Sequence, residues 1–241
     1  MTTETLFRID PYLKSAGAVV IGRTGEGGIL IDRSIFYPRG GGQPGDSGRL
    51  VWDGGTCEIA DSIKAPDGGG IVLVPAAPGT LPPDGAEVEM RLDWDRRHRF
   101  MRMHTALHLL SVVVPLPVTG GQIGAEKSRL DFDMPEVIHD RAFIQARLGQ
   151  FVDADHPVSD EWITEAELDA DPGLVKTLSV QPPRGAGHIR LVRIGAEEAP
   201  VDLQPCGGTH VRSTAEIGPV RVGKIENKGR SNRRISITLE G

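Results

Sequence analysis

Short apolar runs separated by turn residues dominate the first 92 residues. The segment 87–92 (Glu-Val-Glu-Met-Arg-Leu) alternates polar and apolar residues with the period of two that is typical of a half-buried strand. Other runs recur at spacings of roughly 8–12 residues, with glycine, proline and aspartate between them. They lie at 18–21, 29–32, 34–38, 48–52, 57–60 and 71–74. The pattern predicts a β-rich domain over 1–92, built as a small barrel or sandwich.

From residue 93 onward, helical and strand patterns are mixed. A helix is predicted over 96–114, capped by Asp93 or Asp95 and ended by Pro115. Its apolar face comprises Phe100, Met103, Leu107 and Leu110. A second helix is predicted over 136–151 with Val137, Phe143, Ile144 and Leu148 inward, and 164–167 has the form of a capping box. Strand patterns occupy 128–133, 187–194, 201–203, 219–225 and 234–239. We therefore expect an α+β domain over 93–241, with helices on an antiparallel or mixed sheet.

Composition narrows the class of protein. The 241 residues include 31 glycines and 18 prolines but only 5 % aromatic residues, which favours many turns and short strands. Two cysteines exclude a disulfide framework and fit a reducing compartment. The first ten residues lack the pattern of a signal peptide, and no apolar stretch approaches the ~20 residues of a membrane helix. We expect a soluble, cytoplasmic protein without contact to a membrane and with no obligate protein partner evident.

The net charge of −6 argues against a general nucleic-acid-binding protein, but the basic residues are unevenly distributed. Segment 91–104 contains five arginines against two aspartates, and segment 211–241 contains seven basic residues against three glutamates. Each segment borders one of the two candidate metal-binding stretches described next. A local positive surface beside a reactive site suits a specific nucleic-acid substrate, although solvated basic faces would give the same count.

Two pairs of potential metal ligands stand about a hundred residues apart. His104 and His108 would lie one turn apart on the same side of the predicted helix. Cys206 and His210 are joined through two glycines, which favours a tight loop. Three imidazoles and one thiolate form a ligand set that suits Zn²⁺. The alternative is that the histidines are unliganded core or surface residues. Cys57 has no such partner and is predicted to be a small core residue.

Three successive glycines, Gly40 to Gly42, mark the loop 39–48. Their backbone amides can form an anion-binding nest close to a ligand, but a plain hairpin turn explains the same residues. The loop lacks the Gly-Lys-Ser/Thr of a Walker motif.

Taken together, these stretches resemble the editing domain of alanyl-tRNA synthetase, and still more the free-standing AlaX trans-editing proteins. The resemblance is carried by His-Thr-Ala-Leu-His-Leu-Leu (104–110), Pro-Cys-Gly-Gly-Thr-His-Val (205–211) and Lys-Gly-Arg-Ser-Asn-Arg-Arg-Ile (228–235). The loop 37–46 and the stretch 118–124 are similar to the medium-length members, which have an N-terminal β domain.

The resemblance implies a hydrolase that deacylates mischarged Ser-tRNA(Ala), with Gly-tRNA(Ala) as a second substrate. It implies one Zn²⁺ per chain, bound by His104, His108, Cys206 and His210. His104, His108, Cys206 and Thr119 would form the catalytic site. Thr119 is the first candidate for recognising the serine hydroxyl, with Gln122 and Thr105 after it, although an ordinary turn residue would explain Thr119 equally well. The expected tRNA contacts are Arg39, Gly41, Gln43, Lys228, Arg230, Arg233 and Arg234.

Three alternatives remain at this stage. Four protein ligands make a closed tetrahedral site, so the ion either positions substrate or gains an open position, for which His210 is the first candidate to leave. The substrate could be a different tRNA, such as threonine tRNA. The chain could also be a non-catalytic, zinc-stabilised RNA-binding domain.

Overall fold

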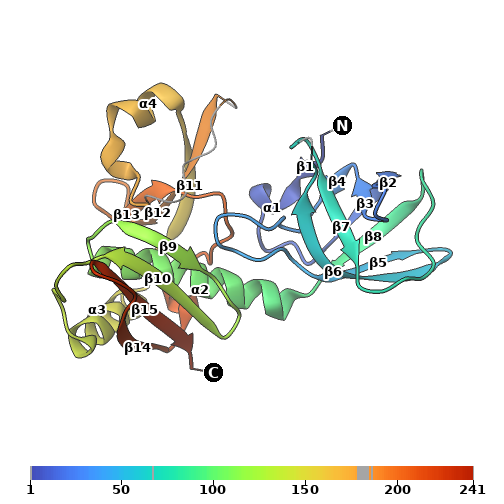
Figure 1. The fold of residues 1–241 in the computed structure, drawn as a ribbon. Helices are drawn as coiled ribbons and strands as arrows, with labels where there is room; N and C mark the ends of the chain where they lie inside the picture. Colours follow the sequence, from blue (N-terminus) through green and yellow to red (C-terminus); the bar gives the residue numbers. More distant parts are fainter. Residues whose placement is uncertain (1, 67, 178–184, 186, 241) are drawn as a thin grey trace. The chain divides into compact units, whose positions relative to one another are not determined.

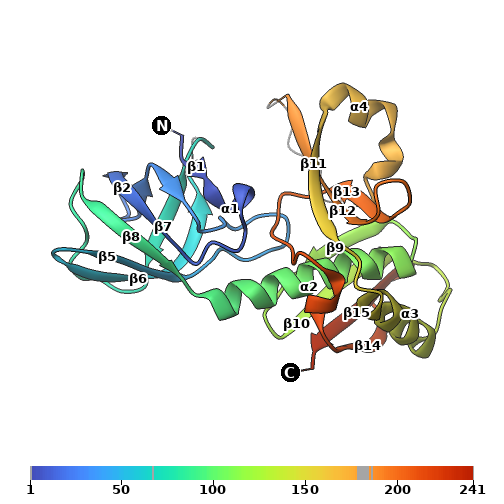
Figure 2. The same ribbon diagram turned by 180° about the vertical axis from the view of Figure 1, so that it is seen from behind.

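The computed structural model describes residues 2–66, 68–177, 185 and 187–240 (Figures 1 and 2). The chain divides into two compact units, Met1–His98 and Arg99–Gly241. The division falls within helix α2 (Trp94–Val113), whereas the sequence predicted it just before that helix. The first turn of α2 belongs with the first unit because the Arg97 side chain is bound among the loops of the barrel. The α+β fold class is confirmed.

The first unit is a closed antiparallel barrel, as predicted. Its strands pair in the order β2-β3-β7-β6-β5-β8, and β8 pairs with β2 to close it. The strands are β2 (Ser15–Arg23), β3 (Ile29–Ile31), β5 (Gly48–Trp52), β6 (Gly55–Lys64), β7 (Ile71–Pro75) and β8 (Glu87–Leu92). The alternation along β8 directs Val88 and Met90 into the core, and Cys57 is also buried there.

The prediction of a strand over 34–38 is wrong. Strand β4 (Arg33–Ser34) pairs in parallel with β1 (Glu4–Thr5), just before helix α1 (Leu6–Ile9), and ends at Ser34. The apolar residues that follow are buried as a loop rather than as a strand. The Tyr37 amide donates to the Asp46 carboxylate at 2.6 Å, which replaces the ladder hydrogen bond that a strand would supply.

Asp46 belongs to a fully buried ion pair. Arg97 is 0 % exposed, and its Nε lies 3.0 and 2.9 Å from the two Asp46 carboxylate oxygens. The same guanidinium donates to the carbonyls of Pro11 and Ile35. The carboxylate in turn accepts from the amide of Tyr37. These contacts fix the glycine-rich loop to the barrel.

The second unit contains two antiparallel sheets instead of the single sheet expected. One has the order β14-β15-β10-β9 and the other β11-β12-β13. The first consists of β9 (Val118–Gln122), β10 (Lys127–Asp133), β14 (Val220–Asn227) and β15 (Asn232–Leu239). The second consists of β11 (Val158–Thr164), β12 (His188–Gly195) and β13 (Pro200–Pro205). The shorter helices are α3 (Arg141–Asp153), α4 (Glu165–Ala170), η1 (Pro172–Leu174) and η2 (Thr214–Ile217). The capping box at Thr164 is confirmed.

Helix α2 forms the centre of the second unit. It crosses the face of the four-stranded sheet in both ribbon views (Figures 1 and 2), and the other sheet contacts it through Asp202. Every residue from Met103 to Ser111 is buried, so this part of the helix is enclosed on all sides. His104 and His108 are therefore buried polar groups that need partners. Asp93 caps the helix, its carboxylate accepting from the Arg96 amide at 3.3 Å.

Helix α3 begins later than predicted. The Asp140 carboxylate accepts from the Phe143 amide at 2.8 Å and caps the helix there, so Val137 precedes it. Val137 and Phe143, predicted to be inward, are 53 % and 44 % exposed. Ile144 and Leu148 are buried, as predicted. The side chain of Phe143 instead stacks on the His139 ring at 4.2 Å.

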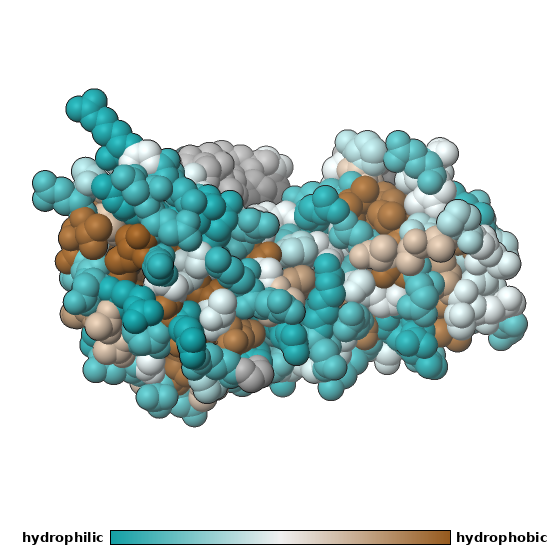
Figure 3. Space-filling view, turned by 60° about the horizontal axis from the view of Figure 1, so that its bottom comes forward, coloured by the Kyte–Doolittle hydropathy of each residue, from teal (hydrophilic) through white to brown (hydrophobic). Residues whose placement is uncertain are grey.

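Hydrophilic surface surrounds small apolar patches in the space-filling view (Figure 3). Among the described residues, the exposed large hydrophobic side chains are Ile9, Val137, Ile138, Phe143 and Trp162. In the same part of the chain, no helix has both the length and the apolar character required to cross a bilayer.

Candidate metal centre

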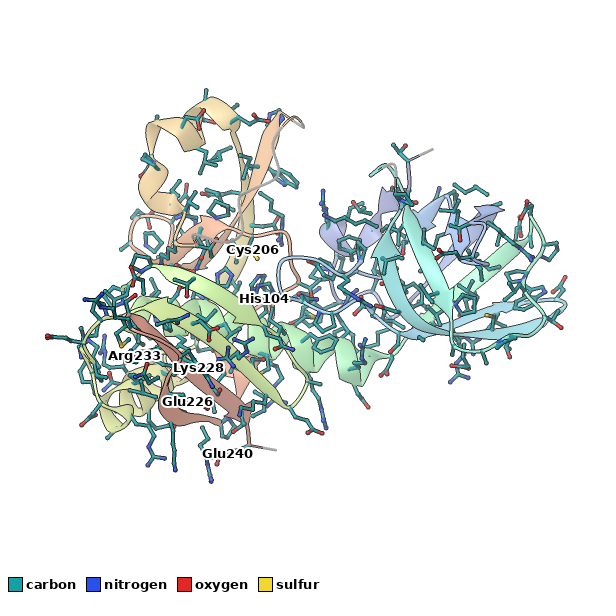
Figure 4. The ribbon with its side chains drawn as sticks, viewed as in Figure 1. His104, Cys206, Glu226, Lys228, Arg233 and Glu240 are labelled. Carbon is teal, nitrogen blue, oxygen red and sulfur yellow. The ribbon has the colours of Figure 1, made fainter. Side chains whose placement is uncertain are left out.

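The two predicted ligand pairs meet in the second unit. One ligand atom from each of His104, His108, Cys206 and His210 lies within 4.8 Å of the others. The Cys206 Sγ is 3.4 Å from the His104 Nε2 and 3.3 Å from the His210 Nε2. Figure 4 shows His104 on α2 close to Cys206 on the loop after β13. The fold thus brings together residues separated by about a hundred positions.

Helix geometry explains the first pair. His104 and His108 are one turn apart on α2, and their ring centroids are 5.3 Å apart. Both side chains are 7 % exposed, which separates them from bulk water. The prediction of two imidazoles on one side of a helix is confirmed.

Backbone contacts fix the loop that carries the second pair. The Arg190 Nη1 donates to the carbonyls of Cys206 and Gly208 at 2.9 and 3.0 Å. The Gly208 amide points at the Cys206 Sγ at 3.4 Å, which stabilises a thiolate. Arg190 therefore holds the loop in the shape that turns Cys206 toward the histidines.

His108 is oriented by a carboxylate that the sequence analysis did not identify. Its Nδ1 lies 2.9 Å from the Asp202 carboxylate, so its Nε2 is left for the cluster. Asp202 is 2 % exposed and also contacts the Lys176 ammonium and the Gln204 amide. A signal was present, because Asp202 and Gln204 precede Cys206 at a spacing of two in an apolar strand. That spacing places Asp202 and Gln204 on one face of β13, and Cys206 continues the alternation just after the strand.

Thr105 fixes the tautomer of His210. The Thr105 hydroxyl donates to the Met101 carbonyl at 3.0 Å, so it accepts from the His210 Nδ1–H at 3.1 Å. The unprotonated His210 Nε2 then faces Cys206. The hydroxyl also accepts from the Val211 amide at 3.4 Å, which uses its remaining lone pair. Thr105 is therefore a poor candidate for recognising a serine hydroxyl.

The surroundings set the charge states of the cluster. Burial raises the pKa of the Cys206 thiol, but electrostatic and hydrogen-bond interactions with the neighbouring histidine side chains outweigh burial and hold the pKa well below its usual value. Burial and the charge of His104 lower the pKa of His210 well below its usual range. Burial also lowers the pKa of His108, but hydrogen bonds to Asp202 and Cys206 raise it to about 9. A thiolate and a neutral imidazole are the ligating forms, and binding of an ion would release the His108 proton.

The spacing of the donors fits a metal ion. In tetrahedral zinc sites, Zn–N and Zn–S bonds of about 2.0–2.1 and 2.3 Å place neighbouring nitrogen and sulfur ligands roughly 3.5 Å apart. The two sulfur–nitrogen distances in the cluster, 3.4 and 3.3 Å, are close to this value. The cluster can therefore hold a metal ion, and its three nitrogen atoms and one sulfur atom are consistent with zinc.

Replacing Asp202 with asparagine is expected to weaken Zn²⁺ binding by about 10- to 100-fold, because the substitution removes the charge that orients His108. A competition titration with a chromophoric chelator measures this change. Asp153→Asn is the matched control, since that residue is exposed at the end of α3. Equal affinities for the two variants would contradict the orienting role.

Thr119 lies at an irregularity of β9. Asp131 pairs with Gly120 and Phe132 pairs with Val118, so Thr119 is the extra residue of a β-bulge. Its Oγ1 is buried and has no hydrogen-bond partner among the described residues. Gln122, the other candidate for serine recognition, is exposed and accepts from Arg129.

The glycine-rich loop belongs to the barrel unit. The Arg39 side chain is 65 % exposed and pairs with Asp61, and Gly41 has a φ of 58°, which favours glycine. Gln43 is 1 % exposed and exchanges backbone hydrogen bonds with Gly40. The loop is thus a tight turn with a buried glutamine, and the tRNA contacts predicted for Arg39, Gly41 and Gln43 stay predictions.

The four basic residues predicted near the C-terminus lie on the β14–β15 hairpin and differ in their surroundings. Lys228 and Arg230 are exposed, and Lys228 pairs with Glu226 at 2.7 Å (Figure 4). Arg233 donates to backbone carbonyls and to the Asn227 side chain. Arg234 forms two hydrogen bonds with Asp131 at 2.7 and 2.9 Å, which raise the pKa of the guanidinium. The tRNA contacts predicted for all four residues are untested. Arg233 and Arg234 already form hydrogen bonds within this unit.

Comparison with known proteins places these features in a family. Residues 189–236 match the family described as the threonyl and alanyl tRNA synthetase second additional domain. An alanyl-tRNA editing protein, AlaX-M, of Methanosarcina acetivorans is 34 % identical over 98 % of this chain and 99 % of its own length. The AlaX-L editing protein of Pyrococcus horikoshii is 32 % identical over 98 % of this chain and 57 % of its own length.

Alanine–tRNA ligases are also similar. The ligase of Pyrobaculum aerophilum is 38 % identical over 93 % of this chain, which spans 25 % of the ligase. The match to AlaX-M, in contrast, covers nearly the whole of both proteins. This chain belongs to the AlaX-M family of alanyl-tRNA editing proteins.

Proposed function

We propose that this protein is a trans-editing hydrolase that deacylates mischarged Ser-tRNA(Ala) in the cytoplasm, with Gly-tRNA(Ala) as a second substrate. The main support for this proposal is that a chain of the AlaX-M family contains the cluster of His104, His108, Cys206 and His210. Action in trans is supported by the alignment with AlaX-M over nearly the full length of both proteins.

Such an enzyme is needed because the amino-acid pocket of a synthetase discriminates poorly between small side chains. A synthetase pocket shaped for alanine rejects glycine only by the free energy of about one methyl group, roughly 1–3 kcal/mol. It also excludes serine weakly, because serine only adds a hydroxyl. In the editing reaction, water adds to the ester carbonyl carbon and the bond to the ribose oxygen breaks. The products are the free amino acid and a tRNA with its terminal hydroxyl restored.

One Zn²⁺ per chain, held by the four cluster residues, would supply Lewis-acid activation of water or of the ester carbonyl. The protein's own residues keep the ligands in place. Asp202 orients His108, Thr105 orients His210, and Arg190 fixes the loop of Cys206. His210 is 4 % exposed and held through its Nδ1, which argues against its being the ligand that leaves.

We propose that the Thr119 side chain recognises the serine hydroxyl. Its buried Oγ1 lacks a partner among the described residues, so a substrate hydroxyl would satisfy it. Its neighbour Val118 donates its amide to the carbonyl of Lys176, whose ammonium contacts Asp202 beside His108. A continuous set of contacts thus links the bulge in β9 to the metal centre. We further propose that Lys228 and Arg230 contact tRNA phosphates, with Arg39 approaching the acceptor stem.

The test is a deacylation assay of the Zn-loaded protein with Ser-, Gly- and Ala-tRNA(Ala) and with Ser-tRNA(Thr). We expect fast hydrolysis of Ser-tRNA(Ala) and slow hydrolysis of Ala-tRNA(Ala). Thr119→Val should reduce the preference for serine over alanine by about 10- to 100-fold, because it removes the hydroxyl without changing the shape of the side chain.

Thr119→Ser is the control for this substitution and should retain most of the preference for serine. Faster hydrolysis of Ser-tRNA(Thr) would reassign the substrate to threonine tRNA. This alternative is tested because the matching family includes domains of both threonyl and alanyl tRNA synthetases. Protein that contains stoichiometric zinc and leaves every charged tRNA intact would instead be a non-catalytic RNA-binding domain.

A further inference from the structure

Three residues form a row across the β11-β12-β13 sheet. Trp162 on β11 is directly opposite Arg190 on β12. Leu191 is paired with Pro205, and the Cys206 amide donates to the Arg190 carbonyl at 3.1 Å. Cys206 therefore continues the register opposite Arg190. Directly paired residues project from the same face of a sheet, so Trp162, Arg190 and Cys206 share one face.

That face carries the metal centre. Asp202 and Gln204, at a spacing of two from Cys206, contact His108 and Ser111 of α2. The opposite face packs a separate apolar cluster formed by Ile163, Leu168, Ile189 and Leu191. Trp162 therefore lies on the reactive side of the sheet and not on the side that contributes to the core beneath α4.

The Trp162 indole is exposed to solvent, and Trp162 lies two strands away from Cys206. Its exposed fraction is 49 %, large for a tryptophan. Strands lie about 4.8 Å apart, so two strand steps place Trp162 roughly 10 Å from Cys206. Arg190, between them, is tied to the loop of Cys206 and cannot swing over the indole without releasing it. Among the described residues, the other large aromatic side chain that is exposed is Phe143, which is already stacked on His139.

We propose that Trp162 stacks against the nucleobase at the 3′ end of the substrate RNA and so positions the aminoacyl ester at the metal centre. The inference rests on the proposed function, because an aminoacyl ester carries its purine base on the far side of one ribose. Stacking of a base on an exposed indole is tolerant of sequence and contributes substantially to binding of single-stranded ends. This assignment gives the exposed indole a ligand and explains its place in the row with Cys206.

The first measurement is steady-state deacylation of Ser-tRNA(Ala) by the Zn-loaded chain. Trp162→Ala should raise KM about 10-fold or more and change kcat little, because stacking holds the substrate without taking part in bond cleavage. Trp162→Phe should restore most of the loss. Phe143→Ala, which removes a similarly exposed aromatic ring from α3, is the matched control and should behave as wild type.

The second measurement does not require deacylation. The chain has three tryptophans, so quenching of fluorescence by the uncharged trinucleotide CCA can be assigned by substitution. Quenching is expected in wild type and should be lost in Trp162→Phe. Trp162→Ala with wild-type KM, or equal quenching in Trp162→Phe, would overturn the inference. Wild type that binds CCA through Trp162 but hydrolyses no charged tRNA would overturn the proposed function alone.

Discussion

Replacing Cys206 with alanine is expected to abolish stoichiometric zinc binding and to lower deacylation of Ser-tRNA(Ala) by more than about 100-fold. Loss of an outer partner of a ligand costs roughly 10- to 100-fold, and loss of the ligand itself should cost more. The variant should remain folded, because Cys206 is not one of the buried apolar residues that form the core. Zinc content per chain, circular dichroism and the deacylation rate measure the three parts of this prediction.

Cys57→Ala provides the matched control. Cys57 is buried in the barrel core, and burial raises the pKa of its thiol, in contrast to the lowered pKa of Cys206. The control variant should lose some stability and keep both zinc and activity. Retention of one zinc per chain in Cys206→Ala would contradict the assignment of the centre. Unfolding of that variant while Cys57→Ala is folded would instead favour the zinc-stabilised RNA-binding domain.

Replacing Arg97 with methionine is expected to destabilise the protein by about 3–5 kcal/mol, the cost of leaving one charge of a buried pair uncompensated. Arg97 is 0 % and Asp46 is 1 % exposed, and the substitution also removes donors from the carbonyls of Pro11 and Ile35. Urea unfolding followed by tryptophan fluorescence reports the barrel through Trp52. The midpoint should fall with little change in slope.

Arg49→Met makes the same substitution in an exposed ion pair of the same barrel. Arg49 and Glu58 are 54 % and 62 % exposed and 3.6 Å apart, so the expected loss is about 0–1 kcal/mol. Similar losses in the two variants would show that burial does not govern the contribution of Arg97.

Local sequence patterns were sufficient to predict the elements in which apolar residues recur at a regular spacing. The alternation of β8 and the helical spacing of apolar residues in α2 are properties of neighbouring residues, and the structure has a strand and a helix where they were predicted. The prediction for α3 was wrong at its start because a single cap, Asp140, determines where the helix begins. The prediction of a strand at 34–38 was wrong because an apolar run does not distinguish a strand from a buried loop held by Asp46.

The four candidate ligands can be identified from the sequence alone, because their types and their spacing of four residues are local properties. The meeting of the two pairs is a property of the tertiary structure, since it requires β13 to lie along α2. The orientation of His108 by Asp202 and of His210 by Thr105 likewise appears only in the folded chain. The alignment of Trp162 with Cys206 depends on the pairing of three strands. Such long-range pairing results from burial and register between distant segments, and neither is encoded within a single stretch of the chain.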